Sequence, residues 1–229
     1  MARLSIVMPV LNEATEIVGA LERLQPLRAR GHEVIVVDGG SGDDTMRLAA
    51  PLADRVLQAP RGRARQMNAG AGHARGDVLL FLHADTRLPQ DADRLIAEPL
   101  AGSAAAWGRF DVAIDGRHPL LRVIAAAMNL RSRATGICTG DQGIFVHRAL
   151  FRAIGGYADI ELMEDIALTR LLRRHAPPAC PARRAVTSGR RWERRGVWRT
   201  MALMWWLRLR YFLGASPARL RRLYEGERT

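Results

Sequence analysis

The feature that most constrains the fold is an alternation of short apolar runs with helix-compatible segments in the first hundred residues. Residues 4–8 (LSIVM), 33–37 (EVIVV) and 78–82 (VLLFL) are nearly continuous apolar runs of strand length. Such runs are typical of strands buried on both faces of a parallel sheet, and their alternation with helices indicates βαβ units. We therefore expect an α/β fold with a mainly parallel central sheet flanked by helices, a weaker strand at 55–57, and helices near 14–27, 43–53 and 64–74.

Beyond residue 96 the regular alternation ends. Strands are expected at 104–114 and 143–146, and helices at 120–133, 164–174 and 197–213, the last ending at Gly214 before a short helix that Pro217 opens. We expect one domain at 1–192 and a basic helical tail at 193–229, which packs on the domain or lies at a membrane surface.

The length and composition suit one cytoplasmic domain. The chain has 229 residues, 48% of them hydrophobic, which is enough for a sizeable core. Cys138 and Cys180 fit neither a metal-ligand spacing nor a disulfide framework, so we expect reduced thiols. No apolar run approaches the ~20 residues that span a bilayer, and the first apolar run is too short for a signal peptide.

The net positive charge lies in the C-terminal segment 173–229, which includes the tail. The formal net charge is +12 and the chain has no Lys, and residues 173–229 contain 15 Arg but only 3 acidic residues. A basic segment can meet phosphate groups, an anionic membrane surface or nucleic acid. The tail also carries an apolar helical face, which suits core packing or a helix at an anionic membrane interface: Trp198, Met201, Trp205, Leu209 and Phe212.

Polar residues stand at the ends of two predicted strands. His83 and Asp85 follow the run LLFL and share one face of the strand, so we expect them to point together into the crevice beyond it. Alternatively, Asp85 only caps the next turn. Asp38 leaves another strand in VVDGGSGDDT, where it can accept hydrogen bonds from a nucleoside or close an Asx turn. Neither GxGxxG nor GxxxxGK[ST] follows the first strand.

Several segments occur in a specific order: PVLNE, VVDGGSGDDT, RGRARQMNAGAGHARGD before LLFLHADT, GDQGIFVHRALFRAIGGY, and MED before a helix. This series resembles the family 2 glycosyltransferases with the GT-A fold. It looks closest to a small bacterial branch with an LFLHADT strand end and an SGRRW-like C-terminal segment. The resemblance covers nearly the whole chain and implies a nucleotide-diphosphate sugar donor with a divalent cation, Mn²⁺ or Mg²⁺.

The resemblance implies a set of donor-binding residues. Asp38 would contact the nucleoside, usually uridine, and Arg63 or Arg65 would lie beside the base or the phosphates. HADT stands in place of the family's DXD motif, so Asp85 matches the metal-contacting acid and His83 replaces the first Asp. His83 would either coordinate the metal and favour Mn²⁺, or hydrogen-bond the sugar. The other implied donor-site residues are Pro9, Asn12, Glu13, Arg190, Arg191 and Trp192.

The resemblance also implies catalytic and acceptor-side residues. Glu164 and Asp165 match the family's ED pair, with Asp165 as the base that takes the proton of the attacking hydroxyl in an inverting displacement. Alternatively, the two acids only favour the dipole of the helix that they begin. The acceptor is expected to be a saccharide, a lipid or a carotenoid-like molecule with a hydroxyl group. The loop that lines its side would contain Gly140, Asp141 and Gln142.

Two other functional classes share some of these features. A nucleotidyltransferase would use a similar crevice, acid and basic loop, but would release pyrophosphate. A nucleic-acid-binding module would account for the basic tail, yet the sequence has no recognisable motif of that class and its arginines interleave with an apolar helix. We therefore expect a nucleotide sugar, a hydroxyl acceptor and an anionic membrane surface as partners, without nucleic acid. The expected location is cytoplasmic, with peripheral attachment to the inner face of the cell membrane as an option.

Overall fold

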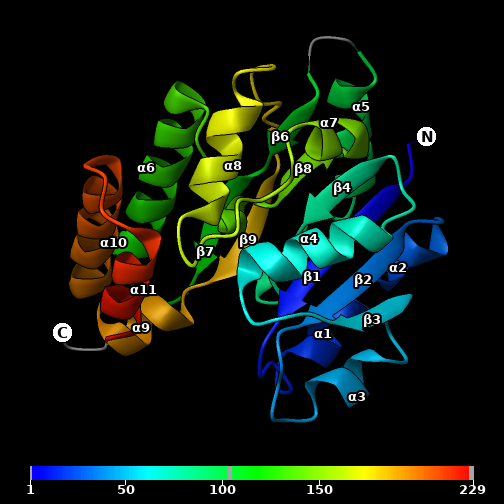
Figure 1. Cartoon of the computed structure of the whole chain (residues 1–229), viewed down its shortest axis with the longest axis horizontal. Coiled ribbons are helices and arrows are strands. Elements are labelled where there is room, and N and C mark those ends of the chain that lie inside the picture. Colours follow the sequence, from blue (N-terminus) through cyan, green and yellow to red (C-terminus); the bar gives the residue numbers. More distant parts are fainter. Residues whose placement is uncertain (1, 103–104, 227–229) are drawn as a thin grey trace.

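The computed structural model describes residues 2–102 and 105–226. At its centre the pairing is parallel across four neighbouring strands, and the strand next to them runs antiparallel to both of its neighbours. This arrangement confirms the predicted α/β fold with a mainly parallel sheet (Figure 1). In spatial order the strands are β3 (Arg55–Gln58), β2 (Glu33–Asp38), β1 (Leu4–Val10), β4 (Val78–Phe81), β8 (Ile144–His147) and β6 (Trp107–Arg109).

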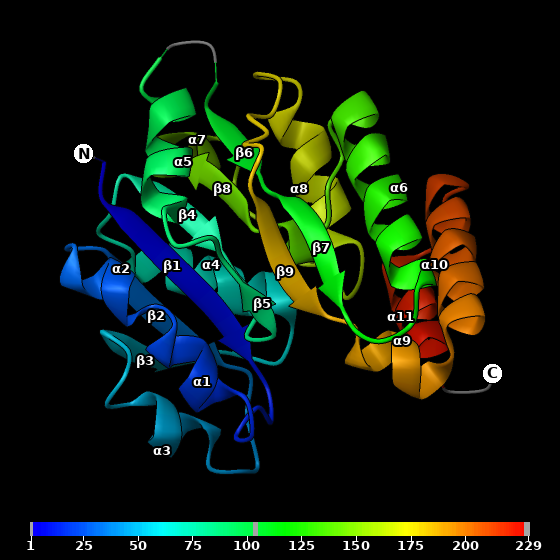
Figure 2. The same ribbon diagram turned by 180° about the vertical axis from the view of Figure 1, so that it is seen from behind.

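Helices cover both faces of this sheet (Figures 1 and 2). Alternate residues of β1 pack on opposite sides, with Ile6 and Met8 in one cluster and Val7 in the other. A Cβ on Gly70 would lie 2.4 Å from Val7 Cγ1, so the glycine lets its helix sit directly on β1. That face is covered by α4 (Arg63–His73), α7 (Arg148–Ala153) and α8 (Glu164–Leu172), and the opposite face by α1 (Ile17–Glu22), α2 (Gln25–Ala29), α3 (Thr45–Ala49) and α5 (Ala92–Leu100).

The single strand expected at 104–114 is instead two strands in different sheets; Ala104 itself lies outside the described residues. β6 stays in the central sheet, whereas β7 (Asp111–Asp115) joins a second sheet. Between them, Phe110 donates its backbone N–H to Gln142 O (2.8 Å). The chain passes from the central sheet to the second sheet at this point, because β7 pairs in parallel with a strand of the second sheet. That strand is not predicted from the sequence. The second sheet has the order β5 (Thr86–Arg87), β9 (Arg184–Ser188), β7.

Prolines explain two helices that are shorter than expected. The helix predicted at 14–27 is split into α1 and α2, because Pro26 has no N–H to continue α1 and instead sits in the first turn of α2. The helix predicted to reach residue 53 ends at Ala49, just before Pro51, which has no backbone N–H to continue the helical hydrogen bonds. The helix α5 was not predicted.

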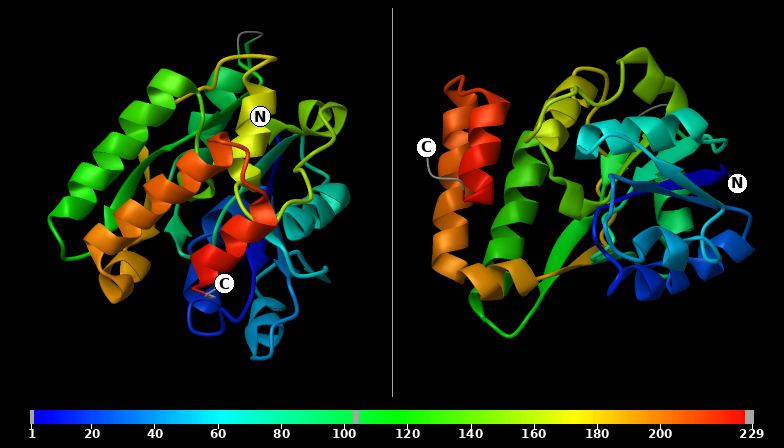
Figure 3. Two further views of the ribbon diagram at one scale, coloured as in Figure 1. Left: turned by 60° about the vertical axis from the view of Figure 1, so that its left-hand side comes forward. Right: turned by 60° about the horizontal axis from the view of Figure 1, so that its bottom comes forward.

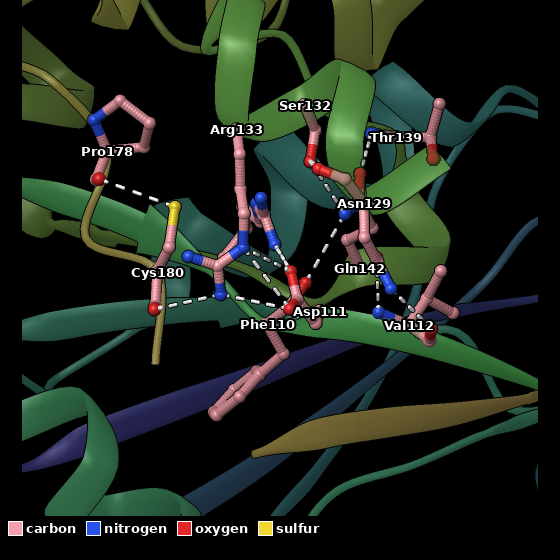
Figure 4. A network of polar contacts seen from close by, with 11 residues as sticks. Phe110, Asp111, Val112, Asn129, Ser132, Arg133, Thr139, Gln142, Pro178 and Cys180 are labelled. Atoms are coloured by element: carbon pink, nitrogen blue, oxygen red, sulfur yellow. Dashed lines mark hydrogen bonds and ion pairs between the residues drawn. The ribbon is translucent and has the colours of Figure 1, made fainter. Parts of the chain in front are cut away.

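The predicted helix at 120–133 is present as α6 (Leu120–Thr135) and is fixed by polar contacts (Figure 4). Asn129 accepts a hydrogen bond from Val112 N (2.8 Å) and donates one to Val112 O (2.9 Å), which ties α6 to β7. Arg133 forms an ion pair with Asp111 at 2.9 Å. These contacts fix the position of α6 beside the second sheet.

The C-terminal helices pack against the rest of the described chain. Leu207 and Leu220 are buried with Met163 and Ile166 at the start of α8, and Val197 is buried against the first turns of α6. Among the described helices, none is both long and apolar enough to cross a bilayer. The C-terminal helices are α9 (Arg190–Arg195), which spans the expected boundary after residue 192, α10 (Val197–Phe212) and α11 (Pro217–Glu225), with α10 running beside α6 (Figure 3).

Candidate active site

Two adjoining cavities open at the carboxyl ends of β1 and β4. The smaller one, about 380 Å³, is lined largely by charged and polar groups and is called the polar cavity below. The larger one, about 700 Å³, lies between α6, α10 and the start of α8 and is called the apolar cavity. The residues that line both cavities include Arg63, His83, Asp141, Glu164 and Arg191. Their junction therefore concentrates the ionisable groups.

The segment after β4 supplies two side chains to the polar cavity. His83 and Asp85 both line it, although β4 ends at Phe81 and the two residues lie after the strand rather than on a shared strand face. Asp85 accepts a hydrogen bond from Thr86 Oγ1 (3.3 Å), and Glu13 from the β1 loop lines the same cavity. Burial raises the pKa of Glu13, and the nearby negative charge of Asp85 raises it further. Two carboxylates thus approach each other, which favours a cation between or beside them.

Two arginines bring positive charge to the same space. Arg63 begins α4 and Arg191 lies in α9, and both line the two cavities. The side chain of Arg191 remains accessible, yet partial burial lowers its pKa, and the positive charge of Arg63 lowers this pKa further. The guanidinium carbon of Arg191 lies 4.9 Å from the ring centroid of Tyr224 in α11, and this cation–π contact holds the Arg191 side chain in position. The planar guanidinium groups suit phosphate oxygens.

The catalytic carboxylates proposed from sequence lie where the cavities meet. Glu164 lines both cavities and Asp165 lines the apolar one. Met163, directly before them, has φ +70°, an unusual left-handed conformation for a non-glycine residue that is typical of functional sites. Asp165 accepts hydrogen bonds from Gly140 N (3.0 Å) and Ile166 N (2.7 Å), so one carboxylate is held in place by two backbone donors.

Both of these carboxyl groups are harder to ionise than exposed acids. Burial raises the pKa of Asp165, and the negative charge of Asp141 adds to this effect. Burial also raises the pKa of Glu164, and Asp165 raises it further. An acid with a raised pKa binds a proton more strongly once it is ionised, which suits a general base.

His83 contacts Asp141, which lies in the loop predicted to line the acceptor side. The distance from His83 Nδ1 to Asp141 Oδ1 is 3.3 Å. A Cβ on Gly140 would lie 2.6 Å from the His83 ring, so glycine is needed for this close approach. Burial acts against ionisation of Asp141, but His83, Arg63 and Arg191 outweigh it and lower the pKa of Asp141. The Asp141 carboxylate is therefore an ionised partner for Arg63 and Arg191.

Two predicted donor-site residues, Asp38 and Asn12, and the predicted acceptor-side residue Gln142 form hydrogen bonds within the protein. Asp38 is fully buried, and its carboxylate accepts hydrogen bonds from Gly40 N (2.8 Å) and Ser41 N (2.9 Å), so the structure favours the Asx-turn alternative. Asn12 accepts from Gly42 N (2.8 Å) and has φ +55°. Gln142 is buried and donates to Ser132 Oγ (3.1 Å). None of the three is among the described residues that line either cavity.

Two predicted arginines are engaged on the surface. Arg65 forms an ion pair with Asp159 (2.8 Å) and lines neither cavity, so the choice between Arg63 and Arg65 falls on Arg63. Arg190 pairs with Glu16 outside both cavities, whereas its neighbour Arg191 reaches them. The remaining predicted donor-site and acceptor-side residues do line a cavity: Pro9, Glu13, Trp192 and Gly140.

The residues present fit a divalent cation only together with a phosphate ligand. Within residues 2–102 and 105–226, no three or more His, Cys, Asp and Glu side chains are grouped as a metal site. Asp85 and Glu13 nevertheless supply two carboxylates to one cavity. Mg²⁺ is usually held by one or two carboxylates plus substrate phosphates, so this donor set fits an ion that arrives with a diphosphate.

Sequence reasoning missed two parts of the site. Arg131 of α6 lines the apolar cavity near Asp165, and its Nε and Nη2 atoms are buried without a hydrogen-bond partner in the described part of the chain. Burial lowers the pKa of Arg131, and Asp165 opposes that effect. The signal available in the sequence was an arginine in an otherwise apolar helical stripe. The second missed part is Tyr224, which comes from a segment predicted as tail.

Comparisons with known proteins show what this chain is similar to. The sequence profile described as "Glycosyl transferase family 2" matches residues 5–154. An undecaprenyl-phosphate 4-deoxy-4-formamido-L-arabinose transferase of Klebsiella pneumoniae is 28% identical over 62% of this chain and 46% of its own length. A PGL/p-HBAD biosynthesis glycosyltransferase of Mycobacterium bovis is 32% identical over 67% of this chain and 62% of its own length. The chain thus spans about half to three fifths of these relatives.

A similar solved structure supports the fold. Glucosyl-3-phosphoglycerate synthase from Mycobacterium tuberculosis, in complex with Mn²⁺, UDP and glucosyl-3-phosphoglycerate, has a TM-score of 0.60. The match covers 82% of this chain and 70% of that one at 20% sequence identity. The predicted GT-A architecture is thereby confirmed.

Proposed function

The chain belongs to glycosyl transferase family 2, and on this premise we propose that it moves a sugar from a nucleotide-diphosphate donor, first of all a UDP-sugar, to an acceptor hydroxyl with inversion. One observation carries the proposal. Groups suited to a diphosphate leaving group, Asp85, Arg63 and Arg191, lie in a cavity that adjoins the carboxylates Glu164 and Asp165.

The proposed reaction is a single displacement. The acceptor oxygen attacks the anomeric carbon, and its proton passes to the Asp165 carboxylate. The bond from the anomeric carbon to the phosphate oxygen breaks, and its electron pair leaves with the nucleoside diphosphate. Because attack and departure take place on opposite sides of one carbon, the configuration inverts. Gly140 N and Ile166 N hold Asp165 in position for the proton transfer.

Arg63 and Arg191 are the proposed partners of the leaving diphosphate. Negative charge grows on its oxygens as the bond breaks, and fixed guanidinium groups stabilise that charge without rearranging. Asp85, with Glu13 beside it, would hold a divalent cation together with the donor phosphates. Such a cation supplies Lewis-acid stabilisation of the leaving group when it is bound. His83 is engaged with Asp141, so we assign it to the sugar side rather than to the metal.

The relatives support the substrate class. The similar mycobacterial structure contains Mn²⁺ and UDP, and the Klebsiella relative is named for transfer to undecaprenyl phosphate. We propose a uridine diphosphate sugar as donor and a lipid-linked or otherwise membrane-embedded acceptor. A cytoplasmic position, peripheral to the inner face of the membrane, follows from such an acceptor.

Thermal unfolding with a panel of nucleoside diphosphates, each with and without Mn²⁺, tests the donor side. A ligand at ~100 times its dissociation constant adds about 2.7 kcal/mol to the free energy of unfolding, which raises Tm by roughly 5–10 °C for this chain length. We expect this rise for UDP with Mn²⁺, and its loss in Asp85→Ala. A metal-independent rise that survives in Asp85→Ala would contradict the role of Asp85.

Product analysis separates this proposal from nucleotidyl transfer. Glycosyl transfer leaves a free nucleoside diphosphate, whereas a nucleotidyltransferase cleaves between phosphates and releases pyrophosphate. The donor that stabilises the protein is the one to use. Pyrophosphate as the product would overturn the proposal while leaving the nucleotide site in place.

A further inference from the structure

The apolar cavity has a composition that the displacement reaction by itself does not require. At about 700 Å³ it falls within the range of roughly 300–1,000 Å³ found for pockets that enclose drug-sized molecules. Two facing helices supply its walls. The side chains that decide its character are Val123, Ala127 and Met128 of α6 and Met201, Met204 and Trp205 of α10. These are methyl, thioether and aromatic groups, which offer dispersion contacts and few hydrogen bonds.

The position of the cavity identifies its occupant as a substrate. Its inner end is formed by Asp141, Glu164 and Asp165, the same groups that border the polar cavity or its junction. A molecule held between α6 and α10 therefore has one end at the proposed base. The outer rim is open, since Val123, Trp198 and Trp205 are 61%, 64% and 67% exposed. A long apolar body can thus enter from the rim and place its polar end at Asp165.

The walls are fixed before any ligand arrives. Hydrogen bonds between Asn129 and Val112 hold α6 on the second sheet, and the pair formed by Arg133 and Asp111 holds it farther along (Figure 4). α10 is pinned at its start by Val197 and near its end by Leu207, both buried. A preformed apolar cavity of this kind binds without the cost of ordering its walls.

We propose that the acceptor is an apolar alcohol whose hydrocarbon body lies between α6 and α10 and whose terminal hydroxyl meets Asp165. This inference rests on the proposed function, because it assigns the acceptor of that reaction. A free saccharide is disfavoured, since the α6 and α10 walls supply mostly apolar groups, with Arg131 and Arg208 as their charged side chains. A sugar needs many more hydrogen-bond partners to replace its water.

The test uses N-phenyl-1-naphthylamine, an uncharged apolar fluorophore, and the alcohol farnesol. The full chain should bind the fluorophore saturably at one site, and farnesol should displace it whereas glucose should not. No saturable binding, or equal displacement by glucose, would overturn the proposal. This arm needs no variant, so it does not depend on the folding of a mutant.

A matched pair of substitutions locates the binding. Ala126 and Ala127 are adjacent exposed residues of α6, but only Ala127 lines the cavity. Ala127→Trp should fill the cavity and weaken fluorophore binding at least tenfold, while Ala126→Trp should bind like the native chain. Equal binding by both variants would place the fluorophore on the exposed apolar rim and overturn the assignment.

The donor side provides an independent readout in the same samples. Stabilisation by UDP with Mn²⁺ should be unchanged in both tryptophan variants, because neither alanine borders the polar cavity. Loss of nucleotide stabilisation in every sample, with the fluorophore still bound at Ala127, would defeat the proposed function and leave an apolar binding site. Nucleotide stabilisation without the Ala127 effect would defeat only the acceptor assignment.

Discussion

The polar and apolar cavities meet at the same carboxylates but are built from different kinds of structure. The polar cavity is formed mainly by residues that directly follow strands or begin helices, such as Glu13, Arg63 and Asp85. The apolar cavity is formed by the sides of two helices, α6 and α10, which are about 60 residues apart in sequence. The polar cavity thus places charged groups at fixed positions, whereas the apolar cavity offers an extended apolar surface. The proposed reaction takes place where they join.

The largest loss of activity is expected when Asp165, which lies where the two cavities join, is replaced. Asp165→Asn removes the proposed base but keeps a side chain of the same shape, so turnover should fall by about 10²–10⁴-fold. Stabilisation by UDP with Mn²⁺ should remain. Turnover is measured as nucleoside diphosphate released from the stabilising donor in the presence of farnesol. Asp159→Asn, which alters a surface acid paired with Arg65, is the control and should keep full activity. Full activity in Asp165→Asn would remove the base from the mechanism.

Two neighbouring arginines test whether the polar cavity binds the nucleotide through a fixed contact. Arg191 reaches both cavities, whereas Arg190 is paired with Glu16 outside them. Charge-assisted hydrogen bonds contribute about 1.5–3 kcal/mol, so Arg191→Ala should weaken UDP binding by roughly 10–100-fold. Arg190→Ala should change it less than twofold. Isothermal titration with UDP and Mn²⁺ measures both. Equal effects would mean that general surface charge, rather than a fixed contact, attracts the nucleotide.

The pH profile examines the carboxylates themselves. A general base must be ionised, and its ionised fraction falls tenfold for each pH unit below its pKa. Because burial raises the pKa of Asp165, the loss of kcat/KM on acidification should begin at a higher pH than for an exposed carboxylate, whose pKa is about 4. Asp141 raises that pKa further, so Asp141→Asn should move the acid limb to lower pH. An acid limb at the pKa of an exposed aspartate, unmoved in Asp141→Asn, would contradict Asp165 as the base.

The same contrast explains what the sequence could and could not predict. The central parallel strands, α4, α6 and α8 follow from strand runs and helical patterns, and short motifs put Asp85 and Asp165 forward as site residues, a role that stays a prediction. The role of Asp38 does not follow from sequence, because an acid after a strand can bind a ligand or close its own turn, and its hydrogen bonds with Gly40 and Ser41 appear only in three dimensions. The second sheet depends on pairing between β7 and β9, about 70 residues apart, which no local pattern encodes.

The apolar cavity could not be predicted from the sequence for a related reason. The helical stripe on α10 was visible, but one stripe can pack into a core, line a cavity or meet a membrane. In the structure the helix serves more than one of these purposes: Leu207 is buried, Met204 and Trp205 line the cavity, and Leu213 is 74% exposed. Leu207 lies on the opposite side of the helix from the predicted stripe, in which Trp198 and Trp205 are largely exposed. Which side of α10 packs depends on how α6 and α8 approach it, which the sequence of α10 does not contain.

The smallest expected effect is a weaker binding to vesicles when exposed leucines at the end of α10 are replaced. Leu209 and Leu213 border neither cavity and stand beside the arginines of the tail, so they can enter the interface of an anionic bilayer. Native protein should co-sediment with phosphatidylglycerol-containing vesicles at low salt, and less at high salt because the charges are screened. Replacing both leucines by serine should weaken binding several-fold, since each loses apolar burial.

The control for this experiment is Leu130→Ser, because Leu130 is similarly exposed but lies on α6 away from the tail. Farnesol displacement of the fluorophore should be unchanged in the double serine variant, because the apolar cavity is intact. If native protein fails to bind vesicles at low salt, the rim does not meet a membrane and the acceptor must reach the cavity from solution. If the double variant loses vesicle binding and keeps farnesol binding, the membrane surface and the acceptor cavity are separate features of one helix.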